Sequence, residues 1–373
     1  MIRAIFFSLV VLASGLSAVT SSIEQAREIH VVIGNEAADL DSIVSSMARA
    51  YVLSMNGRDG ESFFAVINIP RQDLQMRRDA ILLFEMLDVD LSTLFFIDEV
   101  PLDRWAEEGK LFLHLVDHNL LSIQQEHLSD RVLTIVDHHS DAGISYPACR
   151  EKELMTVGSA STLIAKRWLE ESRDQMSSYW ATLLLAPILL DTRGLEDPHT
   201  TTHLDVRVVE ELAQWVESPI ALYESLKEAR FDTKGFTPKM LLRKDMKRYR
   251  DVGVNYTISS LPSTVNYHWH EQADLYNCWS LFRQEEEVPI SMILGRDSSD
   301  QERRLHVQCE SRSLLIQLLF HFTVVVELAE MSLLEYVDES LNSATFVLDE
   351  PASRKVLQPC LRLSQMQTTA SLP

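Results

Sequence analysis

Residues 29–46 read IHVVIGNEAADLDSIVSS, and this stretch decides the fold class. It opens with the short apolar run Ile29–Ile33, and a run of this kind that stops at a polar turn is typical of a strand buried on both faces of a sheet. The turn carries Asp39 and Asp41, and Ser42–Met55 then has the pattern of a helix. We therefore predict a strand, an acidic loop and a helix, in that order.

The same pattern returns further along the chain. Other apolar runs cover residues 94–97, 111–116 and 132–136, and they end in Asp98-Glu99, Asp117-His118-Asn119 and Asp137-His138-His139. Helix-like stretches cover residues 77–87 and 159–170. This alternation predicts an α/β domain with a mainly parallel sheet, in which ligands bind outside the carboxyl ends of the strands. Because acids and histidines follow those ends, we predict that they form one shared site.

A fully apolar run, LLLAPILL at residues 183–190, is followed by Asp191. Pro187 has no backbone N–H to donate to a sheet, which argues against a central strand. We predict a buried, kinked helix that brings Asp191 to the site from its end.

The composition changes after about residue 205, which suggests a second domain. We predict a first domain over residues 23–207, a helical connector over 208–224 and a smaller mixed α/β domain over 225–365. Strand-like pieces in the second domain lie at 252–259, 288–294 and 304–309, with a helix at 314–320.

Residues 239–250 form the densest positive patch of the second domain. In helical register, Arg243, Lys247 and Arg250 would share a face. Such charge runs most often form a solvated face, but in an acidic chain this one is a candidate phosphate-binding site.

Composition limits the classes of partner. The chain has 373 residues, 46% of them hydrophobic, which is enough for two or three domains with a sizeable core. A formal net charge of −21 argues against binding duplex nucleic acid through a basic surface. An anionic substrate would need metal cations or a local basic pocket. The scattered cysteines lack disulfide or metal-ligand spacing and favour a reducing compartment; they are Cys149, Cys278, Cys309 and Cys360.

Residues 1–22, MIRAIFFSLVVLASGLSAVTSS, leave two interpretations open. Arg3, the apolar run and the small residues after it fit a secretory signal peptide, which is too short to span a bilayer comfortably. An apolar amphipathic helix ahead of the first strand fits equally well. We predict a cytoplasmic protein without a membrane span, with the secretory pathway as the alternative if this segment is cleaved.

The acids predict a site for divalent cations. Asp39 and Asp41 stand two residues apart in a tight loop, so that both carboxylates can reach one ion. Mg²⁺ and Mn²⁺ prefer oxygen ligands, and a nearby imidazole favours Mn²⁺. Two ions about 4 Å apart can activate water and clamp the oxygens of an in-line displacement. The alternative role of such an Asp is a helix N-cap, and that of a lone His is structural.

A DxD, a DHN, a DHH and a late LLDT, in this order, resemble the DHH phosphoesterase superfamily. The resemblance is to the branch with a C-terminal DHHA2 domain, which includes exopolyphosphatases, prune-type proteins and family II inorganic pyrophosphatases. It covers roughly residues 29–360. The segments that carry it are GNEAADLDSIVSS (34–46), LVDHN (115–119), IVDHH (135–139), VGSAST (157–162), LLDT (189–192), SLKEARFDTKGFTPKMLLRKDMKRYR (225–250) and SRKVLQP (353–359).

The resemblance implies a role for each matching residue. The implied ligands of two divalent ions, Mn²⁺ or Mg²⁺, are Asp39, Asp41, Asp117, His138 and Asp191, with Asp117 as the bridge. The implied catalytic residues are Asp117, His138 and His139. The implied substrate-binding residues are His139, Lys247, Arg354 and Lys355. Asn35 and Asp137 would contact the metal ligands without binding the metal themselves, and Asp137 would orient the two histidines. The N-terminus of the helix after 157–162 would bind phosphate, an ordinary Gly/Ser cap being the alternative.

The implied activity is that of an exopolyphosphatase-like hydrolase. Metal-activated water, in the cleft between the domains, would release orthophosphate from short-chain inorganic polyphosphate or another small phosphate compound. Pyrophosphatases carry GH where this chain has Gly34-Asn35, which argues against specificity for pyrophosphate alone. Retention of both His138 and His139 argues for a competent site. The alternatives are a prune-like phosphodiesterase, a nucleotide or pyrophosphate hydrolase, and a regulatory binding protein with residual activity.

Overall fold

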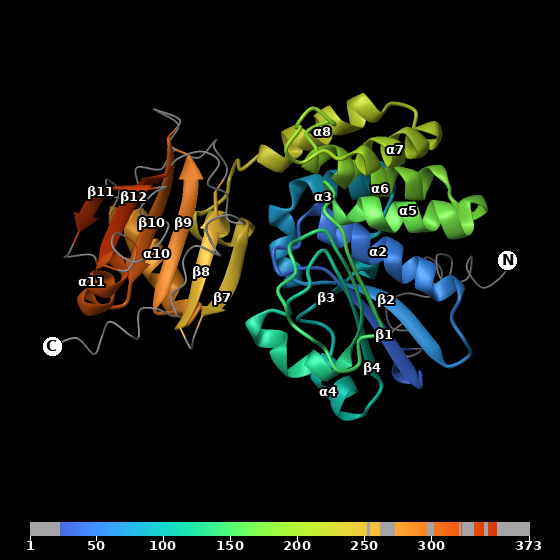
Figure 1. Ribbon diagram of the computed structural model, residues 1–373, viewed down its shortest axis with the longest axis horizontal. Helices are drawn as coiled ribbons and strands as arrows, with labels where there is room; N and C mark the ends of the chain where they lie inside the picture. The colour runs from blue at the N-terminus through green and yellow to red at the C-terminus, as the bar shows by residue number, and fades with distance from the viewer. Residues whose placement is uncertain are drawn as a thin grey trace. The chain divides into compact units, whose positions relative to one another are not determined.

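The computed structural model describes residues 23–251, 254–261, 273–296, 302–320, 322, 332–338 and 342–348. The predictions for residues 1–22, Arg354, Lys355 and Cys360 therefore lie outside the described residues. The chain divides into two compact units between Asp232 and Thr233 (Figure 1). Within the described part of the chain, no helix is long and apolar enough to cross a membrane.

The first unit is built on a six-stranded sheet in which all neighbouring strands are parallel. Its strands, in spatial order, are β3 (Phe95–Phe96), β2 (Glu61–Ile67), β1 (Glu28–Ile33), β4 (Leu111–Val116), β5 (Val132–Asp137) and β6 (Glu151–Leu154). The prediction of an α/β domain with a mainly parallel sheet is confirmed. Strand β2 escaped prediction because its run, ESFFAVI, continues into Asn68 and not into acids or histidines.

The two faces of this sheet bury their apolar side chains against different helices. Val32 and Val116 join the core under α2, whereas Val31 and Leu115 join the core that includes Trp105 of α4. Figure 1 shows α5 to α8 on the same side of the sheet as α2, with α4 on the other side. The helices are α2 (Leu40–Met55), α3 (Arg78–Met86), α4 (Leu102–Glu107), α5 (Ala160–Ser172), α6 (Ser178–Asp191), α7 (His203–Leu212) and α8 (Pro219–Phe231).

Helix α6 is the buried helix that the apolar run at residues 183–190 predicts. Pro187 lies inside it, and Asp191 is its last residue. Every residue from Leu183 to Leu190 is buried, because the helix is covered by α2, α5, α7 and α8. Since α7 and α8 pack against α6, the structure includes them in the first unit, whereas the sequence predicted a connector over 208–224.

The second unit contains a six-stranded mixed sheet, as the prediction of a mixed α/β domain requires. All described pairs in it are antiparallel except β8 with β9. Its strands, in spatial order, are β11 (Ser332–Asp338), β12 (Ser343–Leu348), β10 (Arg303–Cys309), β9 (Ile290–Arg296), β8 (Val254–Ser260) and β7 (Met246–Asp251). Its described helices are α9 (Pro238–Lys244), α10 (Ala273–Glu285) and α11 (Arg312–Phe320).

The prediction of one helical face for Arg243, Lys247 and Arg250 is wrong. Helix α9 ends at Lys244, and Lys247 lies in the edge strand β7, opposite Ile258 of β8. Lysine and arginine favour helices locally, but the strand pairing gained with β8 outweighs that weak preference. Of these basic side chains, Arg243 lies 3.9 Å from a carboxylate oxygen of Glu286.

Candidate active site at the carboxyl edge of the parallel sheet

Two neighbouring strands bring the central group of the site together. Asp137 is the last residue of β5, and Asp117 follows β4 directly in a left-handed conformation, with φ of 59°. The Asp117 N–H donates to the carbonyl of Val136, which fixes this turn against β5. As a result, ligand atoms of Asp117, Asp137, His138 and His139 all lie within 4.8 Å of one another.

The tautomer of His138 is set by its surroundings. Its Nδ1 lies 2.8 Å from the carbonyl oxygen of Val157, which can only accept, so the ring carries a proton on Nδ1. In the neutral ring, the lone pair of Nε2 then points toward Asp117 Oδ1, 3.2 Å away. Two lone pairs at this distance repel unless a cation or a proton lies between them. This donor set of one imidazole and one carboxylate fits a divalent metal ion.

Asp137 holds the turn that carries both histidines. It is fully buried, and its Oδ1 accepts from the backbone N–H of His138 (2.7 Å), the backbone N–H of His139 (3.1 Å) and His139 Nδ1 (2.7 Å). Burial alone would raise the pKa of Asp137, but the hydrogen bonds and charge of His139 lower it. Asp137 therefore stays ionised and orients the His139 ring. The His139 Nδ1 also lies 3.6 Å from Asp117 Oδ1.

Asp117 has its second oxygen anchored from the other side of the site. Its Oδ2 accepts from Asn35 Nδ2 at 2.7 Å and from Ser42 Oγ at 2.6 Å. With Oδ2 held by these donors, Oδ1 lies toward the histidines. Gly34 allows this loop to lie against α2, since a Cβ there would stand 2.7 Å from the Cβ of Ser42. Asn35 therefore helps to position the Asp117 carboxylate.

The acidic loop after β1 has one surface-facing and one buried carboxylate. Asp39 is the N-cap of α2, where its Oδ1 accepts from the Ser42 N–H at 3.1 Å. Asp41 is 3% exposed, and it accepts from the backbone N–H groups of Ala160 (2.6 Å) and Ser161 (2.9 Å). Burial raises the pKa of Asp41 to about 6, with the Asp117 charge as the next cause. Asp39 therefore caps α2, whereas Asp41 accepts from the first N–H groups of α5.

The side chain of Arg77 holds the backbone of this acidic loop in place. Its side chain is buried, and its Nε donates to the carbonyl oxygens of Ala37 (3.0 Å) and Ala38 (2.9 Å). Ala38 has a φ of 43°, so these contacts stabilise a strained turn immediately before Asp39. Arg77 therefore binds the loop that carries the acids.

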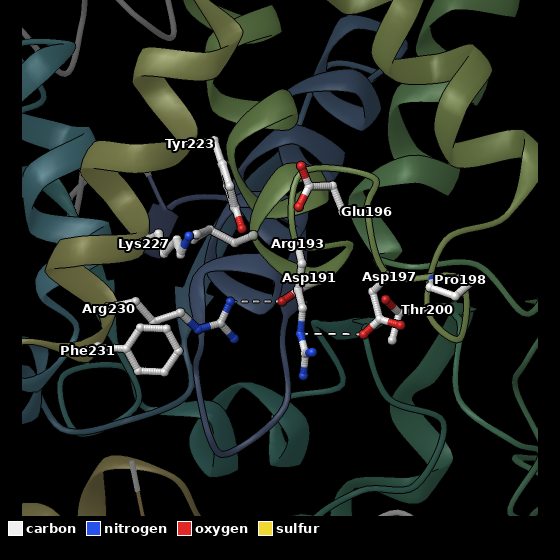
Figure 2. Close-up of a pocket in the computed structure, with 11 residues that line it drawn as sticks. Asp191, Arg193, Glu196, Asp197, Pro198, Thr200, Tyr223, Lys227, Arg230 and Phe231 are labelled. Atoms are coloured by element: carbon white, nitrogen blue, oxygen red, sulfur yellow. Dashed lines mark hydrogen bonds and ion pairs between the residues drawn. The ribbon is translucent and has the colours of Figure 1, made fainter. Parts of the chain in front are cut away.

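Asp191 lies in the wall of a cavity of about 760 Å³ (Figure 2). Its Oδ1 accepts from Arg230 Nη1 of α8 at 3.0 Å, which Figure 2 draws as a dashed line. Burial raises the pKa of Asp191 to about 7 in spite of Arg230, and the charges of Asp41 and Asp39 raise it further. Lys227 and Arg193 line the same cavity. The sequence analysis missed Arg230, and the only available signal was its place in the segment SLKEARF.

The predicted ligands therefore fall into two groups. Asp117 and His138 belong to the group whose ligand atoms all lie within 4.8 Å of one another, and Asp39, Asp41 and Asp191 do not belong to it. The second group is still within electrostatic reach of the first, since Asp117 and His138 act on the pKa of Asp41. A bound cation would relieve the repulsion among these carboxylates, so the residues fit one or two divalent ions.

The prediction that the helix N-terminus after residues 157–162 binds phosphate is wrong for the described structure. The N–H of Gly158 donates to both oxygens of Asp205, at 3.0 and 2.9 Å, and Asp41 takes the N–H groups at the start of α5. Thr162 Oγ1 also donates to Asp205, at 2.6 Å. The chain's own carboxylates thus occupy the donors that an anion would need. Asp205, 43 residues beyond Thr162, gave no signal in the sequence.

Comparison with known proteins places both units in known families. Residues 30–188 match the DHH family, N-terminal domain, and residues 224–363 match the DHHA2 domain. Exopolyphosphatase PRUNE1 of Homo sapiens is 34% identical over 245 residues, which is 65% of this chain and 54% of the relative. A probable manganese-dependent inorganic pyrophosphatase of Streptococcus thermophilus is 28% identical over 187 residues, which is 49% of this chain and 54% of the relative.

This chain thus spans about half the length of these curated relatives. Among solved structures, a Methanococcus jannaschii protein described as a family II inorganic pyrophosphatase aligns with a TM-score of 0.64 and 21% identity. The alignment covers 89% of this chain and 98% of the other, and it shows a shared fold.

Proposed function

Since the chain belongs to the DHH phosphoesterase superfamily, in the branch with a DHHA2 domain, we propose that it is a metal-dependent hydrolase releasing orthophosphate from inorganic polyphosphate. The observation that carries the proposal is the approach of Asp117 Oδ1 to His138 Nε2, which lie 3.2 Å apart with each side chain oriented by other contacts. The name of the human relative, an exopolyphosphatase, supports the substrate class.

Asp117 and His138 would hold one ion between them, and a second ion would recruit Asp39, Asp41 and Asp191. Mn²⁺ is the ion we assign, because imidazole favours a transition metal and one relative is named as manganese-dependent. When bound, such ions lower the pKa of water and neutralise charge on phosphate oxygens. The four carboxylates would stay ionised around them, and the net charge of −21 would no longer repel the substrate locally.

His139 would face the substrate. Because its Nδ1 donates to Asp137 Oδ1 at 2.7 Å, we assign the contact with phosphate to its Nε2, on the far side of the ring. A protonated ring would donate from Nε2 to a phosphate oxygen, with Asp137 balancing the positive charge. Asp137 would act on the substrate only through this ring.

Substrate binding by the second unit is a further part of the proposal. We assign substrate binding to Lys247, Arg354 and Lys355. Of these three, Lys247 is a described residue and lies in β7. A longer anionic substrate needs cations beyond the metal centre, and these residues match the DHHA2 segments that carry the resemblance. Lys247→Ala should then raise KM for polyphosphate more than it lowers kcat.

The test is a substrate panel on chelated protein reloaded with Mn²⁺ or Mg²⁺. Orthophosphate release would be measured from short and long polyphosphate, pyrophosphate and a cyclic nucleotide. We expect release from polyphosphate, and a loss of about a hundredfold or more in Asp117→Asn, since an anchored metal ligand disappears. Asp98→Asn is the matched control, because Asp98 follows β3 shortly after its end, accepts from the Arg71 N–H at 3.1 Å and does not belong to the group around Asp117. Activity and metal content unchanged in Asp117→Asn would refute the assignment, as would no release with either ion.

Pyrophosphate is the second candidate substrate, favoured by the similarity to the Streptococcus thermophilus protein. Against it stands Asn35, whose side chain donates to Asp117 and cannot serve as an imidazole ligand. Asn35→His should therefore raise the turnover of pyrophosphate relative to polyphosphate if the missing ligand limits that reaction. An unchanged ratio would remove pyrophosphate from consideration.

A further inference from the structure

A second group of possible metal ligands lies at the opposite edge of the parallel sheet. Glu28 is the first residue of β1, Glu61 is the first residue of β2, and the two face each other in the strand register. Ligand atoms of Glu28, His30 and Glu61 all lie within 4.8 Å of one another. Because the strands are parallel, this amino-edge cluster (Glu28, His30 and Glu61) is separated from the proposed active site by the length of β1.

His30 is the member that points to a ligand. Its side chain is 9% exposed, and its Nε2 is buried without a hydrogen-bond partner among the described residues. Glu28 Oε2 approaches that atom to 3.6 Å. The ring is held in place by stacking on Phe63, with 4.3 Å between ring centroids, and on Phe112, at 5.0 Å. An oriented nitrogen thus faces two carboxylates.

A relay behind His30 has a tautomer in which Nε2 can bind a cation. His30 Nδ1 lies 3.0 Å from His114 Nε2, and His114 Nδ1 lies 2.8 Å from Thr134 Oγ1. Burial lowers the pKa of both histidines, so both rings are neutral at pH 7. With a proton on each Nδ1, His30 donates to His114, His114 donates to Thr134, and the lone pair of His30 Nε2 faces the carboxylates. Metal-binding histidines are commonly supported by such a donor contact on the second nitrogen.

Among the described residues, neither carboxylate forms an ion pair with a lysine or arginine. Like charges directly opposite each other on neighbouring strands are destabilising. In the described ion pairs, Glu28 contacts His30 alone, and Glu61 contacts no lysine or arginine. Glu61 Oε2 does accept from the backbone N–H of Arg58, at 2.7 Å, which orients it without neutralising it.

From this geometry we propose that Glu28, His30 and Glu61 form a divalent transition-metal site, for which Zn²⁺ is the fitting ion. One imidazole and two carboxylates, with an open position for water, suit Zn²⁺ better than Mg²⁺, which prefers oxygen ligands alone. The bound ion joins the first residues of β1 and β2. Its role is to stabilise the amino edge of the sheet, and the site stands independently of the proposed hydrolase activity.

The first experiment counts zinc. Chelated protein is saturated with Zn²⁺, desalted and analysed for zinc per chain by mass spectrometry. We expect Glu61→Gln and Glu28→Gln each to bind one zinc fewer than the wild type, whatever the proposed active site holds. Asp103→Asn is the control, because Asp103 makes a surface pair with His127 at 2.7 Å and has no third ligand. A wild-type zinc count in both Glu variants would overturn the proposal.

The second experiment separates this site from the active site. In an Asp117→Asn background, Zn²⁺ should still raise the melting temperature, and adding Glu61→Gln should reduce that rise. Thr134→Val, which breaks the relay without touching a ligand, should weaken zinc binding by about 10- to 100-fold. The proposal is wrong if Zn²⁺ does not raise the melting temperature while Glu61→Gln alone raises it. Glu28 and Glu61 would then repel each other without binding a metal ion.

Discussion

The hydroxyl of Ser42 provides a stringent test of how the site is held. Ser42 is 1% exposed, and its Oγ donates to Asp117 Oδ2 at 2.6 Å, while Asn35 donates to the same oxygen at 2.7 Å. Ser42→Ala removes one of these two donors and leaves the other. A hydrogen bond to a buried charged group contributes about 1.5–3 kcal/mol, and each 1.4 kcal/mol corresponds to about a tenfold change in an equilibrium constant.

We therefore expect Ser42→Ala to weaken Mn²⁺ binding by about 10- to 100-fold, because Asp117 is no longer held with Oδ1 toward His138. The assay is calorimetric titration of the chelated protein, followed by turnover at saturating metal. Ser46→Ala is the matched control: Ser46 lies in the same helix, is equally buried, and its hydroxyl donates to the carbonyl of Ile43 at 2.8 Å. Equal metal affinities in the two variants would refute the reasoning.

Three further predictions concern other parts of the first unit. Burial lowers the pKa of His114 from 6.5 to about 3. The unfolded chain therefore takes up the proton first, and the free energy of unfolding falls as the pH drops below 6.5. Urea unfolding in the presence of a chelator should show a loss of about 2 kcal/mol from this residue between pH 7 and pH 5. Arg77→Met should reduce turnover, because the turn before Asp39 loses its donors, and phosphate release would measure this. Asp205→Asn should lower stability by about 1.5–3 kcal/mol in urea unfolding, because Gly158 and Thr162 lose a charged acceptor.

Each of these has a distinguishing control. In His114→Gln the loss of stability between pH 7 and pH 5 should shrink, and an unchanged slope would assign it to other groups. Arg71→Met removes a guanidinium that also donates to two carbonyl oxygens, of Leu91 (2.9 Å) and Leu94 (2.6 Å), but far from the acidic loop. If Arg71→Met impaired turnover as much as Arg77→Met, the loop would not be the cause. For Asp205→Asn, unchanged stability would mean that the network around Gly158 adds nothing.

The strand ends illustrate what could be predicted from sequence. The runs that became β1, β4 and β5 each stop at a polar turn, and a parallel sheet brings such turns to one edge. Asp117, His138 and His139 therefore come together largely as a consequence of local patterns. β7 illustrates the opposite case: MKRYRD has the composition of a solvated helix and becomes an edge strand only because β8 offers a partner.

By itself, the sequence determined the α/β class, the strands that end in acids, the buried helix that delivers Asp191 and the membership of a phosphoesterase superfamily. These features depend on the periodicity of neighbouring residues, which is written in the chain. Only the tertiary structure decided that Asp41 binds the start of α5, 119 residues away, and that Asp205 fills the predicted phosphate-binding site. The partner of a buried carboxylate depends on which distant backbone N–H groups folding brings to it, and no local pattern carries that information.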